Sequence, residues 1–287
     1  MRIDPDLQAH VAKAFEPLNN ESSANAFPAP ASLSLALRKV NISGATGLVP
    51  VGKTPAIAKL FTTAAVDMWL RAVHSFLISA SLTNVSPIWA SATGYYSSHY
   101  AVRAMAHLLG FYQLFSQKKI VRLELQSGRF VCNFDPKEER DREHRFYWKK
   151  VKLNPLFAAD PFFTQNLPGP AGECDVAHRD HANYADHLSS FPMFRPLDAV
   201  AVKNRIERIS EIEFDAPPIP QVNCYPDLQS VQIIAYHRLV RFRDVVDTIV
   251  GTDNRFWKFH RNPKWARDSM DFQLTETNPL RSPYSLS

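Results

Sequence analysis

Residues 94–110 read Gly-Tyr-Tyr-Ser-Ser-His-Tyr-Ala-Val-Arg-Ala-Met-Ala-His-Leu-Leu-Gly, and their spacing predicts one amphipathic helix. At about 100° per residue, one face collects small and apolar side chains, namely Ser98, Ala101, Val102, Met105, Leu108 and Leu109. The opposite face carries a Tyr-Arg-His stripe, which consists of Tyr96, Tyr100, Arg103 and His107. Such a stripe can stack on bases and contact phosphate, or it can pack against a second helical bundle.

Composition indicates a soluble globular chain. Its 287 residues can form one large domain with additions or two small domains. The 45% hydrophobic and 21% charged residues are typical of a protein with a packed core, and 21 prolines against 9 glycines predict stiff connections. The net charge of +5 favours an anionic partner, although the same excess spread over this length also suits a solvated surface.

Cysteine usage and the hydrophobic pattern predict a cytoplasmic protein. Cys132, Cys174 and Cys224 are odd in number and far apart, which argues against a disulfide framework. The first residues carry acids where a signal peptide needs basic ones. Residues 72–102 lack Asp, Glu, Lys and Arg, but polar residues and Pro87 interrupt the apolar run. We therefore expect buried helices and no membrane partner.

The periodicity of the chain predicts a mainly α fold with an inserted small antiparallel sheet. Alternating residues on either side of Ser127-Gly128 predict a hairpin, and 146–153 reads as a third strand. Helices are predicted over 4–18, 55–82, 87–115, 173–188, 197–212 and 230–250, the last ended by Gly251. The predicted parts are an N-terminal extension and linker (1–54), the first half of a helical bundle (55–116), the inserted β-rich segment (117–172), the second half of the bundle (173–215), and a Pro-rich connector with a long helix and a basic-aromatic tail (216–287).

Two segments resemble one known family. Ala92-Thr93-Gly94-Tyr95-Tyr96, followed by Ala101, Arg103, Ala104, Leu108, Leu109 and Gly110, looks like the Tyr-Tyr helix of HEPN (higher eukaryotes and prokaryotes nucleotide-binding) domains. Arg179-Asp180-His181-Ala182-Asn183-Tyr184 is similar to the Arg-polar-x-Ala-x-Tyr element of a later helix in that family. The resemblance covers 55–115 and 173–214, and it implies a HEPN-like helical bundle into which the sheet is inserted.

The resemblance implies either a metal-independent endoribonuclease of a microbial toxin or antiviral defence system, or a non-catalytic helical interaction subunit of a multiprotein complex. In ribonuclease members, four to six residues separate the Arg from the His, and the residue directly after the Arg is polar. Here His181 follows Asp180 at once, and His187 has seven residues between it and Arg179, so both alternatives stay open. The resemblance also implies a homodimer, because the cleft of such proteins is commonly built across two bundles.

In the ribonuclease alternative, the resemblance gives each residue a role. Arg179 would hold the scissile phosphate, and His181 or His187 would serve as acid or base while the RNA 2′-hydroxyl attacks. The residues Tyr96, Tyr100 and Arg103 would line the approach. This chemistry requires no metal or other cofactor.

The C-terminal part carries a basic-aromatic cluster. Cations recur at every third residue from Arg255 to Arg267, interleaved with Phe and Trp. This composition suits RNA, with Arg255, Lys258, His260 and Arg261 as candidate contacts, but the aromatic residues can also dock on the preceding helix and leave the cations solvated. Arg255 and His260 have the family's spacing but lie outside the segment that resembles the bundle.

Two further stretches match ligand-binding patterns, but the residues around them argue against a binding site. Residues 47–54, Gly-Leu-Val-Pro-Val-Gly-Lys-Thr, satisfy the phosphate-loop pattern, but the preceding residues are polar and Pro55 follows, so we predict a turn before the first bundle helix. Cys174, His178 and His181 share a helical face, yet the first and last lie roughly 10 Å apart, too far to bind one zinc ion. No metal site is predicted.

Overall fold

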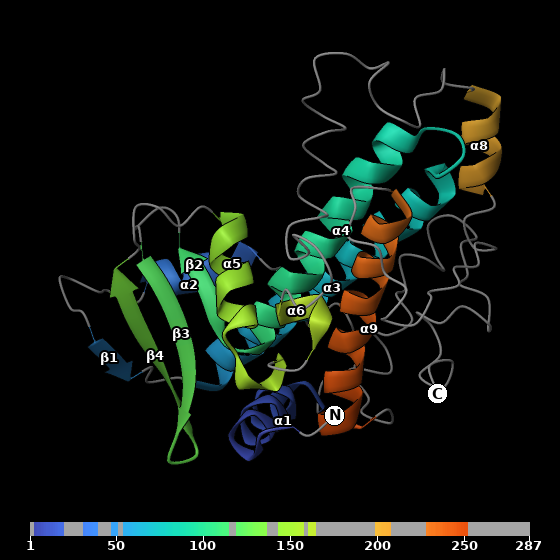
Figure 1. Ribbon diagram of the computed structural model, residues 1–287. Coiled ribbons are helices and arrows are strands. Elements are labelled where there is room, and N and C mark those ends of the chain that lie inside the picture. The colour runs from blue at the N-terminus through green and yellow to red at the C-terminus, as the bar shows by residue number, and fades with distance from the viewer. Residues whose placement is uncertain are drawn as a thin grey trace. The chain divides into compact units, whose positions relative to one another are not determined.

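The computed structural model describes residues 3–19, 31–39, 47–50, 54–114, 119–136, 143–157, 160–164, 199–207 and 228–251 (Figure 1). These residues are mainly helical with a small antiparallel sheet, which confirms the predicted fold class. Their contacts divide the chain into two compact units. Unit 1 comprises Met1–Met68, Val102–Leu156 and Val245–His260, and unit 2 comprises Trp69–Ala101, Phe157–Asp244 and Arg261–Ser287.

Unit 1 contains a four-stranded sheet of order β1-β4-β3-β2, in which every neighbouring pair is antiparallel. The strands are β1 (Gly47–Pro50), β2 (Phe111–Leu114), β3 (Lys119–Gln126) and β4 (Arg129–Pro136). The predicted hairpin is confirmed, because Gln126 pairs with Arg129 across a two-residue turn. Ser127 and Gly128 both have positive φ (49° and 75°), which matches the twist of a tight hairpin.

The predicted third strand over 146–153 is wrong, because this segment forms helix α5 (Glu143–Lys152). Its aromatic residues suggest a strand, yet Tyr147 and Val151 are one helical turn apart and are buried together with Phe146. Helix α5 packs against β2. The outer strands β1 and β2 come from segments that the sequence assigned to a turn and to the end of a helix.

The helix that carries the stripe is α4 (Pro87–Leu108), and it ends before the predicted Phe115. Gly110 ends it with a φ of 85°, and its carbonyl accepts a hydrogen bond from the Leu123 N–H (2.8 Å). A Cβ at this position would lie 2.5 Å from the Leu123 carbonyl oxygen. Only glycine combines this backbone conformation with so close an approach to β3, so the chain turns here from helix into β2.

The core of unit 1 joins the sheet to three helices. Helix α1 (Pro5–Asn19), helix α2 (Ala31–Lys39) and the first part of α3 (Thr54–Leu82) supply Ala14, Leu33, Leu37, Ile57, Ala58, Phe61 and Ala64. The strands supply Leu114, Val121, Leu123, Phe130 and Cys132. The residues before the first bundle helix therefore contribute packed helices and a strand to this unit.

Unit 2 is helical in the part that the structure describes. It holds residues from α3, α4 and α9 (Leu228–Val250), together with α6 (Pro161–Thr164) and α8 (Ala199–Glu207), while the 3-10 turn η3 (Pro155–Phe157) lies at its boundary with unit 1. Helix α9 matches the prediction, and Gly251 ends it with a φ of 83°. The predicted helix over 173–188 lies outside the described residues. None of the helices that the structure describes is long and apolar enough to cross a membrane.

Helices α3, α4 and α9 approach closely in unit 2 because small and polar residues line their contacts. A Cβ on Gly94 would lie 2.9 Å from Ser79 Oγ and 3.1 Å from Val231 Cγ1. Between α3 and α4, Ser97 Oγ donates to the Ala72 carbonyl (2.8 Å). Between α3 and α9, the Trp69 indole N–H donates to the Leu239 carbonyl (3.0 Å). These bonds satisfy buried polar groups that would otherwise destabilise the packing.

Candidate functional site

The Tyr-Arg-His stripe of α4 is divided between the two units. Tyr96 and Tyr100 belong to unit 2, whereas Arg103 and His107 belong to unit 1. The small and apolar residues on the opposite face are buried as predicted, from Ser98 to Leu109. The two ends of the stripe have different environments.

The unit 2 end of the stripe is an exposed aromatic surface. Tyr96 is 41% exposed, and its ring stacks on that of Tyr100 with centroids 6.0 Å apart. Trp89, seven residues before Tyr96 and therefore on the same side of α4, is 62% exposed. We call Trp89, Tyr96 and Tyr100 the aromatic face. The sequence pointed to the two tyrosines but missed Trp89, which continues their spacing by two turns towards the start of the helix.

The unit 1 end of the stripe is a hydrogen-bond chain that joins a buried histidine to a half-buried arginine. His107 is only 2% exposed, and its Nδ1 lies 2.9 Å from the Phe111 carbonyl oxygen. A carbonyl can only accept, so Nδ1 carries the proton and Nε2 accepts from the Nε–H of Arg103 (3.3 Å). The guanidinium of Arg103 in turn lies over the Tyr147 ring, with Cζ 5.2 Å from its centroid.

The imidazole of His107 is held neutral. Burial lowers its pKa to about 3, the charge of Arg103 acts in the same direction, and the bond to the Phe111 carbonyl opposes both. Its ring also contacts the rings of Tyr112 and Tyr147, each with a centroid separation of 5.3 Å. A neutral, enclosed imidazole suits packing and the orientation of Arg103 better than proton transfer.

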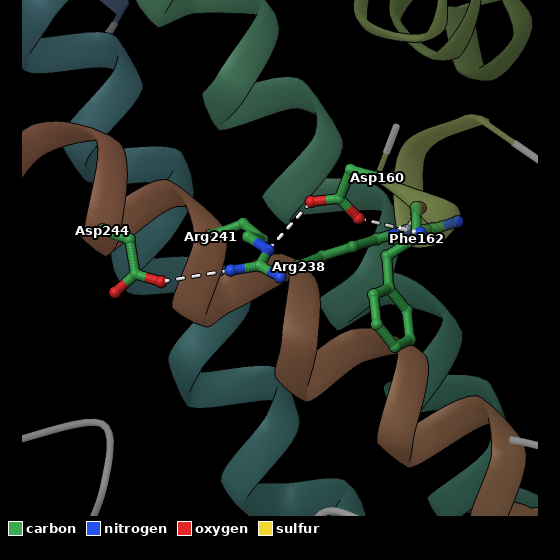
Figure 2. Close-up of polar contacts among 5 residues, drawn as sticks. All are labelled: Asp160, Phe162, Arg238, Arg241 and Asp244. Atoms are coloured by element: carbon green, nitrogen blue, oxygen red, sulfur yellow. Dashed lines mark hydrogen bonds and ion pairs between the residues drawn. The ribbon is translucent and has the colours of Figure 1, made fainter. Parts of the chain in front are cut away.

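A second polar cluster joins α6 to α9 within unit 2 (Figure 2). Asp160 accepts from the Phe162 N–H (3.0 Å) and from Arg241 Nε (2.8 Å), so it caps α6 and binds α9 at once. Arg241 also approaches Asp244 at 3.6 Å. The neighbouring Arg238 is buried, and its Nε donates to the Phe162 carbonyl (2.9 Å) while a second N–H reaches Ser98 Oγ.

This cluster binds the short helix α6 to α9, and the charged groups of Asp160, Arg238 and Arg241 are engaged in hydrogen bonds within unit 2. Two local signals in the sequence indicate it: Asp160-Pro161 is a cap followed by a first-turn proline, and Arg241 and Asp244 have the spacing of a helical ion pair. The pairing of Asp160 with Arg241 spans 81 residues and has no local signal. We read the cluster as structural.

The candidate catalytic residues Arg179, His181 and His187 lie outside the described residues. The same holds for Arg255, Lys258, His260 and Arg261 of the basic-aromatic cluster, and for Cys174 and His178. The structure therefore places only the α4 part of the predicted site. Within the described ranges, no group of three or more His, Cys, Asp or Glu residues could hold a metal ion.

Two other reactive side chains in unit 1 are enclosed. Burial raises the pKa of the Cys132 thiol to about 12, so it is protonated at neutral pH and is a poor nucleophile. Burial lowers the pKa of His10 to about 4, and its ring meets the edge of Phe130 with centroids 5.3 Å apart. Both groups act as packing residues.

The phosphate-loop pattern begins in a strand. Gly47 to Pro50 form β1 and pair with β4 from Phe134 to Val131, and α3 begins at Thr54. The predicted turn is thus wrong for the first four residues. Extended backbone in an edge strand does not curl around a phosphate in the way that a phosphate loop does.

Searches against protein-family models, curated proteins and solved structures each found no match to this chain.

Proposed function

We propose that this protein is a HEPN-like RNA-binding protein that stacks single-stranded bases on the aromatic face of α4. The observation that carries the proposal is the exposure of Trp89 and Tyr96, with Tyr100 stacked beside the latter. Large aromatic side chains cost free energy when they face water, and every base offers a flat ring to cover them. A row of such rings binds single strands with little sequence preference.

Ribonuclease activity in a toxin or defence system is the catalytic form of this proposal. It rests on the resemblance that assigns Arg179 to the scissile phosphate and His181 or His187 to proton transfer. Labelled RNA incubated with the purified protein in EDTA would then yield 2′,3′-cyclic phosphate ends. The His181→Ala and His187→Ala variants would identify the histidine that is required, and no cleavage by folded wild-type protein would reject catalysis.

The second candidate is a non-catalytic interaction subunit whose aromatic face binds a protein partner. The high exposure of Trp89 favours it, because tryptophan is enriched among the residues that dominate protein interfaces. Both candidates use the same face of α4. They differ in whether the isolated protein binds RNA.

RNA affinity measured by fluorescence anisotropy separates the candidates. The double variant Trp89→Leu/Tyr96→Leu keeps apolar volume but removes two rings, and we expect it to bind a labelled single strand at least about tenfold more weakly. Leu153→Ala is the matched control, since Leu153 is also exposed (68%) but lies on no aromatic face. Wild-type protein that does not bind RNA at low salt, or a double variant that binds as well as wild type, would favour the protein partner.

A further inference from the structure

Helix α5 buries an apolar side and carries three lysines in its last turn, of which Lys150 lies one turn after the buried Phe146. Its buried residues are Phe146, Tyr147 and Val151, and they bind it to the rest of unit 1. Its last turn carries Lys149, which is exposed, and Lys150 and Lys152, which are half-buried. Residues 146–153 contain three lysines and no acidic residue. The sequence pattern predicts a strand for this segment and indicates no function for its lysines.

Lys150 is held against two aromatic rings. Its ammonium nitrogen lies 5.3 Å from the centroid of Phe111 and 5.8 Å from that of Phe146. These cation–π contacts restrict a side chain that is otherwise flexible. A restrained ammonium loses less conformational entropy when an anion binds, so the geometry favours anion binding over a freely solvated lysine.

Arg103 lies against the ring of Tyr147, which is in contact with the Phe146 ring beside Lys150. Its guanidinium covers Tyr147, whose ring meets that of Phe146 edge to face at 5.0 Å between centroids. The neutral Nε2 of His107 accepts the Nε–H of Arg103, and the other imidazole nitrogen is fixed by the Phe111 carbonyl. Two cations from different helices are therefore placed on adjacent rings by packing within unit 1.

We propose that Arg103, Lys149, Lys150 and Lys152, here called the cationic surface, bind the phosphate backbone of RNA. The proposal rests on the proposed function, since it takes RNA as the ligand, but it assigns backbone contacts to unit 1 that are separate from base stacking. Lysine offers a compact point charge and arginine a planar fork, and both suit phosphate oxygens. Neutralising a phosphate releases counterions, so these contacts make the affinity depend on salt.

The salt dependence of RNA affinity tests this surface. The variant Lys149→Gln/Lys150→Gln removes two cations, and we expect it to reduce the slope of log affinity against log salt by about 1.4, because each phosphate contact with a single strand contributes about 0.7. The control Lys203→Gln/Arg205→Gln removes the same charge from exposed positions of α8 and should leave the slope as in wild type. Lys150→Arg keeps the charge and should keep the slope.

Each outcome decides the matter. If wild-type protein binds RNA but Lys149→Gln/Lys150→Gln leaves the slope unchanged, or if both double variants reduce it equally, the cationic surface is rejected while RNA binding stands. If wild-type protein binds no RNA at low salt, the proposed function fails and takes the surface with it. The exposed Lys149→Gln single variant, expected to lower the slope by about 0.7, repeats the test with the least risk to folding.

Discussion

The two ends of the α4 stripe share their spacing but not their surroundings. Tyr96 is 41% exposed in unit 2, whereas His107 is 2% exposed in unit 1, beneath β2 and α5. Helical periodicity places side chains on a face, but whatever packs on that face decides whether they meet solvent or a core. One stripe in the sequence therefore has two roles in the structure. Its tyrosines form an exposed surface for stacking, and its buried histidine holds Arg103 in place.

Replacing Gly110 is expected to disturb the buried end most, because Gly110 turns the chain from α4 into the strand that encloses His107. In Gly110→Ala, a positive φ and a Cβ 2.5 Å from the Leu123 carbonyl oxygen should lower the free energy of unfolding by about 3 kcal/mol. Urea denaturation measures the change. Gly128→Ala is the control, since Gly128 also has positive φ but open space around it, and it should cost about 1 kcal/mol. Equal losses would show that the close approach to β3 is unimportant.

The neutral state of His107 makes the buried end sensitive to acid. Above an unfolded pKa of 6.5 both states are neutral, and below it only the unfolded chain binds a proton until the pH nears the folded pKa of about 3. The free energy of unfolding must therefore fall as the pH falls through this window. Burial lowers the pKa values of His10 and His74 too, and both act in the same direction.

Urea denaturation at two pH values isolates the share of His107. Between about pH 7 and pH 5, wild-type protein should lose about 2 kcal/mol more stability than His107→Gln, which cannot titrate. A Tyr96→Phe variant should keep the pH dependence of wild type. Parallel curves for wild type and His107→Gln would mean that folding does not lower the pKa of His107.

Arg103→Gln tests how much the contacts of Arg103 with His107 and Tyr147 stabilise unit 1. The variant loses the contact with Tyr147 and the hydrogen bond to His107, and we expect about 1 kcal/mol of lost stability. Lys203→Gln on α8 serves as the exposed control and should change stability by less than about 0.5 kcal/mol. If the two variants have the same free energy of unfolding in urea, the contacts of Arg103 do not stabilise the buried end of the stripe.

The smallest effect on stability is expected at the exposed end. Tyr96→Ala removes a side chain that is 41% exposed and should change the free energy of unfolding by less than about 0.5 kcal/mol. Thermal or urea unfolding checks this. A loss comparable to that of Gly110→Ala would place Tyr96 in a core and remove the basis of the aromatic face.

Much of the helical part could be predicted, because long elements carry repeated signals. The helices over 54–82 and 228–250 showed several turns of periodicity, and Pro87 and Gly251 marked a beginning and an end. The hairpin was predictable from alternation around Ser127-Gly128. In each case the deciding information lies within the element itself.

The elements that failed prediction depend on distant partners. Strands β1 and β2 have four residues each, too few to show a period, and pairing with β4 and β3 defines them. Helix α5 begins its buried face with Phe146 and Tyr147, residue types that favour strands, and its packing on β2 overrides that preference. The burial of His107 could not be predicted for the same reason. Helical spacing identifies its neighbours on α4, but not the strand β2 and the helix α5 that cover it.

The most direct test compares the RNA affinities of Tyr96→Leu and His107→Gln under one condition, with both proteins shown to be folded. If the stripe has a binding end and a structural end, Tyr96→Leu should bind a labelled single strand about tenfold more weakly with unchanged stability. His107→Gln keeps an amide oxygen that can accept from the Arg103 Nε–H, so it should stay within about twofold of the wild-type affinity despite its lower stability. Equal affinities for Tyr96→Leu and wild type, or a larger loss in His107→Gln than in Tyr96→Leu, would contradict the division of the stripe into a binding end and a structural end.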